Sequence, residues 1–229
     1  MPLQRFSSIT RSTCDQKAVS IIAHSIQQLL KKQPQVVLGL PGGRSVAGIF
    51  TLLKSEKNIP WDKVHLFWVD ERLVPLTDKD SNYHLAKELF LDELVQQKML
   101  PLKNIHPFDF TKGITSYQQE LQKYGGKYDI CLWGAGEDGH IAALFPNHHS
   151  VTDKSFSFIS FHDSPKPPAG RMTMSAHLIA TTDVGIVLFY GDGKREALKR
   201  FKGKKSSIAD CPAKLLYTIK DSYMLTDLQ

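Results

Sequence analysis

The sequence is poor in cysteine and lacks the usual metal-binding spacings. Its three cysteines, Cys14, Cys131 and Cys211, are odd in number and far apart, which argues against a disulfide framework and indicates reduced thiols of a cytosolic protein. The nine histidines include no His-x-x-x-His pair, and no cysteine pair occurs. We therefore expect no metal site.

Long apolar runs are also absent. No segment approaches the roughly 20 apolar residues of a membrane helix, and residues 1–13 lack the apolar block and small-residue site of a signal peptide. These absences predict a cytoplasmic protein with no membrane partner. The chain has no internal repeat, low-complexity tract or linker, and its hydrophobic content of 41% suffices for a full core, so we interpret residues 1–229 as a single domain.

The net charge of +6 points only weakly to an anionic partner. The densest basic cluster, residues 194–205, also contains Glu196 and has an amphipathic pattern. Nucleic-acid binding would instead require a basic stripe interleaved with aromatic residues. We expect no nucleic-acid partner, because a small phosphorylated substrate explains the sign of the charge equally well.

Apolar residues recur at helical or strand spacing along the chain. Helices are expected over residues 15–32 with Asp15 as N-cap, 46–54 with Ser45 as a candidate N-cap, 81–95, from a capping box at Thr115, and 194–201. Strands are expected over residues 36–40, 64–69, 106–108, 128–133, 156–161 and 184–190, with 215–225 as an edge strand or irregular. Because strands alternate with helices, the pattern predicts an α/β fold with a Rossmann-like, mostly parallel sheet and helices on both faces.

Glycine or charged residues follow four of the expected strands. They are Gly42-Gly43, Asp70 to Arg72, Gly134 to His140, and Gly193-Lys194. In a parallel sheet, ligands bind beyond the carboxyl ends of the strands. The four segments are therefore expected to line one shared crevice.

The segment Gly134-x-Gly136-x-x-Gly139 matches a dinucleotide-binding fingerprint, but its surroundings exclude that function. The third glycine should begin a long helix, whereas Pro146 limits any helix here to about two turns. The ribose-binding acid expected ~20 residues further on is not evident. We reject a nicotinamide cofactor.

His140 directly follows this glycine turn and stands beside Asp138, a candidate orienting acid. A lone histidine is more often structural, but an imidazole presented at a strand end by a glycine turn suits proton transfer near neutral pH. His148 and His149 come shortly after, in a polar loop, and are expected to be solvated.

Three further segments carry candidate anion ligands. Asp70-Glu71-Arg72 is either a solvated turn with a local ion pair or part of a site in which Arg72 offers a planar fork suited to phosphate. The proline-rich loop 165–171 is either a stiff surface connection or the support of Lys166 and Arg171. Lys194 begins a helix, where an anion is favoured, although a lysine is ordinary there.

Several motifs together resemble one family. They are Val69-Asp70-Glu71-Arg72-x-Val74-Pro75 with Ser81-Asn82-Tyr83, Gly134-x-Gly136-x-Asp138-Gly139-His140 with Leu144-Phe145-Pro146, Pro165-Lys166-Pro167-Pro168-x-x-Arg171-x-Thr173, and Gly193-Lys194. In this order, and over about residues 36–216, the set resembles the 6-phosphogluconolactonases. The resemblance implies the isomerase/deaminase-like Rossmannoid fold.

Glucosamine-6-phosphate deaminase is the alternative that shares this fold and the Asp-Gly-His loop. It follows the histidine with Ala-Phe-Asn-Glu-Pro, whereas residues 142–146 here read Ala-Ala-Leu-Phe-Pro and contain no carboxylate. The lactonase pattern is altered in two places. Ser-Gly-Gly-Ser-Thr-Pro becomes Pro-Gly-Gly-Arg-Ser-Val at residues 41–46, and the Thr-Ala/Ser-Ser after the histidine becomes Ile-Ala-Ala at residues 141–143.

The resemblance implies hydrolysis of 6-phospho-D-glucono-1,5-lactone to 6-phospho-D-gluconate, in the oxidative pentose phosphate pathway, without metal or organic cofactor. His140 would be the general acid/base, and Asp138 would orient it or contact the sugar. The expected substrate ligands are Gly42, Gly43, Arg44, Asp70, Arg72, Arg171 and Lys194. A non-catalytic sugar-phosphate-binding module remains an alternative, and we favour a monomer.

Overall fold

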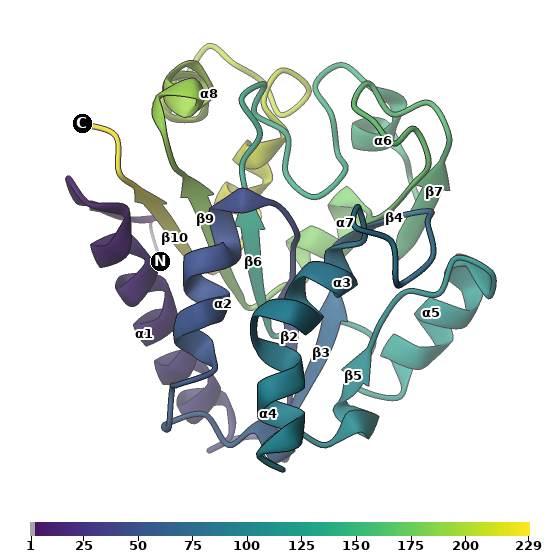
Figure 1. The fold of residues 1–229 in the computed structure, drawn as a ribbon. Coiled ribbons are helices and arrows are strands. Elements are labelled where there is room, and N and C mark those ends of the chain that lie inside the picture. The colour runs from purple at the N-terminus through teal and green to yellow at the C-terminus, as the bar shows by residue number, and fades with distance from the viewer. Residues whose placement is uncertain (1–2) are drawn as a thin grey trace.

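A seven-stranded sheet runs through the middle of the structure, a computed structural model that describes residues 3–229 (Figure 1). The strand order is β1-β10-β9-β6-β2-β3-β5, and every neighbouring pair is parallel. The strands are β1 (Gln4–Ser7), β2 (Val36–Leu40), β3 (Val64–Trp68), β5 (Ile105–His106), β6 (Ile130–Gly134), β9 (Val184–Phe189) and β10 (Asp221–Thr226).

A second, antiparallel sheet of three strands lies at the carboxyl end of β3. It has the order β4-β8-β7 and consists of β4 (Asp70–Arg72), β8 (Arg171–Met174) and β7 (Phe158–Phe161). Val69 joins the two sheets, because its N–H donates to the carbonyl of Leu40 at 3.0 Å and its carbonyl accepts from Met174 at 2.9 Å. This sheet was not predicted, since Asp70 to Arg72 was expected to be a turn or loop.

Helices cover both faces of the large sheet. They are α1 (Arg11–Leu29), α2 (Ala47–Leu53), α3 (Asn82–Ala86), α4 (Asp92–Gln96), α5 (Gly113–Gln122), α6 (His149–Thr152), α7 (Ala176–Ala180) and α8 (Arg195–Lys202). In Figure 1, α1, α2 and α4 lie in front of the sheet and α7 lies behind it. Strand side chains alternate between two buried cores: Leu66 and Trp68 join the core under α1 and α2, and Phe67 joins the core on the other face. The predicted α/β fold is confirmed.

Three predicted helix starts were wrong. Ser45 is not the N-cap of α2, because it lies within a 3-10 turn (Arg44–Val46) and α2 begins at Ala47 without a side-chain cap. The first helix begins four residues earlier than Asp15, where the Thr10 hydroxyl accepts from the N–H of Thr13 at 3.3 Å. Asp15 lies inside the helix and is buried against α2, where a Cβ on Gly48 would lie 2.2 Å from its carboxylate. The helix α5 begins at Gly113 without a side-chain cap, so Thr115 is not its N-cap.

The C-terminal segment is more regular than expected. A 3-10 helix (Pro212–Thr218) precedes β10, which lies between β9 and β1 and is therefore not an edge strand. The edge is formed by β1, whose short and largely exposed sequence, Gln-Arg-Phe-Ser, gave no strand signal. Among residues 3–229, no helix is long and apolar enough to cross a membrane.

Candidate active site

Three loops meet at the carboxyl edge of the large sheet, where they follow the adjacent strands β9, β6 and β2. Together with the small sheet they enclose a cavity of about 550 Å³. The polar and glycine residues that line it include Arg11, Gly42, Gly43, Arg44, Asp70, Arg72, Asn82, Glu137, His140, Lys166, Asp192 and Lys194. The crevice expected from four strand ends is therefore a single cavity.

His140 lines this cavity, and its side chain is paired with Asp138. Nδ1 of His140 lies 2.6 Å from Oδ1 of Asp138, and the backbone N–H of His140 donates to the same oxygen at 3.2 Å. Burial opposes ionisation of Asp138, but the hydrogen bond and charge of His140, with the charge of Lys166, hold its pKa well below the usual range. Because Nδ1 carries the proton toward a carboxylate, Nε2 is the ring nitrogen that remains as a base.

Glycine is required where the chain turns toward this pair. A Cβ on Gly136 would lie 2.0 Å from Nδ1 of His140 and 2.4 Å from Oδ1 of Asp138, so no larger residue fits. The turn is closed by the N–H of Gly136 donating to the carbonyl of His140 at 2.8 Å. Gly139 adopts a φ of 91°, which other residues rarely adopt. The glycines of this turn therefore place the imidazole of His140 beside Asp138.

Two further histidines follow the turn, and only one of them is solvated as expected. The side chain of His149 is 55% exposed, whereas that of His148 is 14% exposed, so the expectation was wrong for His148.

The proline-rich loop delivers a lysine to the pair. Nζ of Lys166 lies 3.2 Å from Oδ2 of Asp138, on the oxygen that His140 does not use. Arg171 is only 4% exposed, and its guanidinium donates to the carbonyls of Lys166 and Pro167 at 3.1 and 3.0 Å. Burial, and the charge of the neighbouring Arg72, lower the pKa of Arg171 to about 10. Its contacts hold the loop in place.

A fully buried carboxylate organises the segment around Asp70 and Arg72. Glu71 accepts hydrogen bonds from the N–H groups of Arg72, Asn82 and Tyr83 and from the Ser81 hydroxyl, at 2.7 to 3.0 Å. Asn82 in turn donates to the carbonyl of Asp70 at 2.8 Å. These bonds explain why residues 70–72 and 81–83 occur as one motif.

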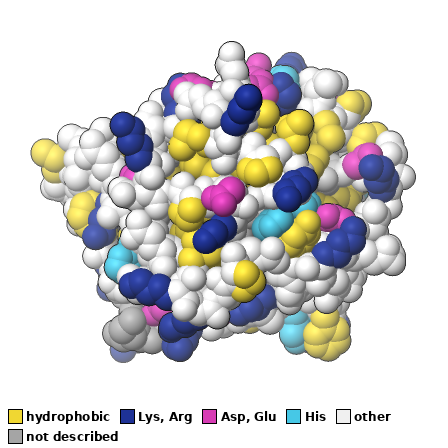
Figure 2. All heavy atoms as spheres, turned by 90° about the horizontal axis from the view of Figure 1, so that it is seen from below, with side chains coloured by type: hydrophobic (Ala, Val, Ile, Leu, Met, Phe, Trp, Pro, Cys, Tyr) yellow, Lys and Arg dark blue, Asp and Glu magenta, His cyan; other side chains and the backbone are white. Residues whose placement is uncertain are grey.

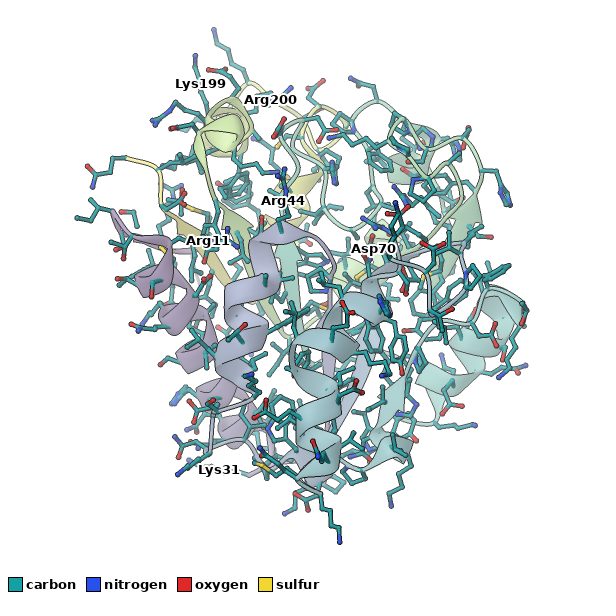
Figure 3. The ribbon with its side chains drawn as sticks, in the orientation of Figure 1. Arg11, Lys31, Arg44, Asp70, Lys199 and Arg200 are labelled. Atoms are coloured by element: carbon teal, nitrogen blue, oxygen red, sulfur yellow. The ribbon has the colours of Figure 1, made fainter. Side chains whose placement is uncertain are left out.

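Cations gather around the same cavity. Five lysine or arginine side chains line it, against the three carboxylates Asp70, Glu137 and Asp192. Figure 3 shows Arg11 and Arg44 near one another at the tops of α1 and α2, where the Arg11 guanidinium donates to the Arg44 carbonyl. Burial lowers the pKa of Lys194, with the charges of Lys166 and Arg44 adding to the effect. On the face seen from below in Figure 2, Lys and Arg side chains are dispersed instead.

The nine residues proposed from the sequence fall into two groups. Gly42, Gly43, Arg44, Asp70, Arg72, His140 and Lys194 line the cavity, whereas Asp138 and Arg171 lie behind it. The expected substrate ligands did not include Arg11, Glu71, Asn82 or Lys166, although Lys166 was a candidate anion ligand on the proline-rich loop. The last three belong to motifs already visible in the sequence, but nothing local marks Arg11, which reaches the cavity from the first turn of α1.

The fold and cavity together define an α/β protein with a cavity lined by cations at the carboxyl edge of a parallel sheet. The chain belongs to the family of glucosamine-6-phosphate isomerases/6-phosphogluconolactonase. The sequence model of this family matches residues 10–224. This membership confirms the resemblance carried by the motifs.

Individual relatives span most of the chain. The 6-phosphogluconolactonase of Borreliella burgdorferi is 30% identical over 203 residues, 86% of each chain. The crystal structure of 6-phosphogluconolactonase from Thermotoga maritima has a TM-score of 0.83 at 22% identity and covers 98% of both chains. A monomeric glucosamine-6-phosphate deaminase has a TM-score of 0.81 at 21% identity over 98% of this chain and 97% of that chain. The fold is thus shared by both activities.

Proposed function

We propose that this protein hydrolyses 6-phospho-D-glucono-1,5-lactone to 6-phospho-D-gluconate, as a single-domain enzyme. The observation that carries the proposal is the His140–Asp138 pair, 2.6 Å apart, at a cavity lined by five cations. The first curated relatives bear the name 6-phosphogluconolactonase, which supports this substrate. A cationic cavity of about 550 Å³ is large enough for one phosphorylated sugar ring.

In the proposed reaction, Nε2 of His140 takes a proton from a water molecule as that water attacks the lactone carbonyl. The resulting imidazolium then gives the proton to the ring oxygen as the ester bond breaks, so the histidine returns to its neutral form. Asp138 accepts the Nδ1–H, which fixes the tautomer and stabilises the imidazolium. Lys166 favours the ionised form of Asp138 from the far side of the carboxylate.

The phosphate is proposed to bind between Gly42, Gly43 and Arg44 on one side and Lys194 on the other. Backbone N–H groups of a first helical turn and nearby cations both favour an anion. Anchoring the phosphate holds the lactone carbonyl near His140. Asp70 and Arg72 line the remaining wall, where Asp70 can accept hydrogen bonds from sugar hydroxyls. Arg171 is assigned to positioning the loop that carries Lys166.

Two alternatives predict different outcomes. A glucosamine-6-phosphate deaminase would release ammonia from glucosamine 6-phosphate, and its shared fold keeps that substrate worth testing. Residues 142–146 contain no carboxylate for its proton relay, which favours the lactonase. A non-catalytic sugar-phosphate-binding module would bind 6-phosphogluconate without accelerating lactone opening.

The test measures lactone opening above its spontaneous rate for the native chain, His140→Asn and the matched control His177→Asn, which removes an exposed imidazole. General acid–base catalysis is worth roughly 10²–10⁴-fold, so we expect kcat to fall by that factor in His140→Asn alone. A native chain that does not accelerate lactone opening would refute the proposed enzymatic activity. Equal rates for the native chain and His140→Asn would refute the role of His140.

A further inference from the structure

Arg11 reaches the cavity from the first turn of α1 and contacts two of the loops that line it. Nη2 of Arg11 donates to the carbonyl of Arg44 in the β2 loop, residues 41–46. The guanidinium carbon lies 5.4 Å from the centre of the Tyr190 ring, directly before the β9 loop, residues 191–194. Arg11 therefore joins the loops that follow the two strands beside β6.

A buried carboxylate holds the Arg11 side chain in this position. Nε of Arg11 lies 3.8 Å from Oδ2 of Asp15, one helical turn further along α1. Burial raises the pKa of the Asp15 carboxyl group, and the charge of Arg11 opposes that shift. The Arg11 side chain is still 41% exposed, and a guanidinium has five N–H donors. It is therefore both fixed in place and open to a ligand.

The charge of Arg11 does not serve its own helix. The N-terminus of a helix carries a partial positive charge and favours anions, so a cation in the first turn is unfavourable there. Residues 11–14, the first turn of α1, contain Arg11 and no acidic residue. The end of α1 thus presents only positive charge beside the cavity, which suits an anion bound there rather than the stability of α1.

Two of the five cations at the cavity already have protein partners. Nζ of Lys166 lies 3.2 Å from Oδ2 of Asp138. Nη1 of Arg72 donates to the carbonyl of Asp80 at 2.5 Å. The other three cations are Arg11, Arg44 and Lys194, which come from three different segments of the chain. A phosphate group offers three strongly accepting oxygens, so three cations can share it.

We propose that Arg11 is a ligand of the substrate phosphate and completes a site with Arg44 and Lys194. This inference rests on the proposed function. The planar fork of the guanidinium suits phosphate oxygens, and its bond to the Arg44 carbonyl can persist while the anion binds. Arg11 then holds the β2 and β9 loops around the phosphate, in addition to contributing its charge.

Arg11→Ala is the variant that tests this role. Because charge-assisted hydrogen bonds to phosphate are lost, we expect KM for the lactone and Kd for inorganic phosphate to rise about tenfold. His140 is untouched, so kcat should stay within about twofold of the native value. Steady-state rates above spontaneous opening give KM and kcat, and isothermal titration of the full chain with inorganic phosphate gives Kd.

Two further variants control for charge and geometry. Arg11→Lys keeps the charge but not the fork, so it should recover part of the phosphate affinity that Arg11→Ala loses. Lys31→Ala removes an exposed cation at the opposite end of α1, as Figure 3 shows, and should leave KM and Kd at their native values. A loss in Lys31→Ala equal to that in Arg11→Ala would overturn the proposal, because net charge alone would explain it.

The competing explanation is that Arg11 only holds the two loops together. That role predicts a lower melting temperature for Arg11→Ala without ligand and a native rise when inorganic phosphate is added. A phosphate ligand predicts a native melting temperature without ligand and a smaller rise with phosphate.

The phosphate titrations decide the role of Arg11 separately from the reaction. The proposal is overturned if the native chain binds no inorganic phosphate, or if Arg11→Ala binds it with native affinity. If the native chain fails to open the lactone, the proposed function falls, whereas the titrations of the native chain and Arg11→Ala still show whether Arg11 binds the anion.

Discussion

Two loops on either side of β6 have the same backbone design but different supports. The β2 loop (residues 41–46) has Gly43 at a φ of 89°, followed by a 3-10 turn (Arg44–Val46) and α2. The β9 loop (residues 191–194) has Gly191 at a φ of 83°, followed by a 3-10 turn (Asp192–Lys194) and α8. Each loop therefore connects a strand to the following helix and places one cation at the cavity.

The supports differ in burial. The β2 loop packs on Asn82, which is buried and tied to Glu71 and to the Asp70 carbonyl. The β9 loop is held by Asp227, whose carboxylate accepts from the N–H of Gly191 at 2.8 Å near the surface. One side of the proposed phosphate site therefore rests on buried groups and the other on a hydrogen bond near the surface, which predicts that the first tolerates substitution less well. Four sets of variants test it.

The largest change in the free energy of unfolding is expected at Glu71, because its buried carboxyl group supports the β2 loop and not the β9 loop. Burial raises the pKa of Glu71 to about 7, from 4.5, although the N–H donors of Asn82, Tyr83 and Arg72 oppose the shift. Between these pH values the folded chain holds a proton that the unfolded chain has released. The free energy of unfolding should therefore fall by roughly 3 kcal/mol from about pH 4.5 to 7.

Urea unfolding of the native chain and Glu71→Gln across this range checks the Glu71 prediction. Glutamine has the same shape but cannot titrate, so the contribution of Glu71 to the pH dependence of the free energy of unfolding disappears. It also turns an amide N–H₂ toward a backbone donor, which should lower stability at every pH. An identical pH slope in both proteins would contradict the assignment.

Gly42→Ala and Gly193→Ala compare the two supports directly. A Cβ on Gly42 would lie 1.8 Å from the Asn82 amide oxygen, whereas one on Gly193 would lie 2.8 Å from the end of the flexible Glu137 side chain. Gly42→Ala should cost up to about 3 kcal/mol of stability by overpacking, and Gly193→Ala much less. Thermal unfolding and KM measured on both variants would show the difference, and equal losses would mean that the β9 loop is just as rigid.

Gly43→Ala and Gly191→Ala test the shared backbone design. Both glycines have ψ angles, 168° and 152°, that together with their positive φ exclude other residues. A Cβ at either position meets no atom within 4 Å, so the cost is conformational alone. We expect losses of about 2 kcal/mol in both variants. A difference larger than the error of chemical denaturation would show that the loops are not equivalent.

Lys194→Ala and Arg44→Ala test the two cations. Lys194 is half-buried and Arg44 is exposed, so the charge of Lys194 is less screened by solvent. We expect kcat/KM for the lactone to fall about tenfold in Lys194→Ala, a loss near 1.4 kcal/mol, and only a few-fold in Arg44→Ala. The reverse order would place the phosphate on the β2 loop alone.

The parallel sheet was predictable because its strands are continuous apolar runs that alternate with helical patterns. Val36–Leu40 and Val64–Trp68 needed no tertiary information. The small sheet could not be foreseen, because Asp70–Arg72 forms a strand only by pairing with Arg171–Met174, a hundred positions away. The strand β1 could not be foreseen for the same reason, since among residues 3–229 it pairs with β10 alone.

The site could be predicted from the sequence where a candidate catalytic or binding residue directly follows a predicted strand. His140, Lys194 and the glycines of the β2 loop were found in this way. Arg171 and Lys166 show the limit, because the sequence presents both cations on one loop without telling which faces the cavity. Only folding reveals that the arginine binds its own loop and that the lysine reaches Asp138.

The cavity is lined by residues that lie far apart in the sequence and are therefore synthesised at different times. Arg11 follows β1, which pairs with β10 far along the sequence, yet Arg11 and Lys194 line the same cavity. A nascent chain that extends just past His140 still lacks β10, the strand with which β1 pairs. The proposed binding of a phosphorylated sugar should therefore require that Arg11 and Lys194 have both reached the cavity.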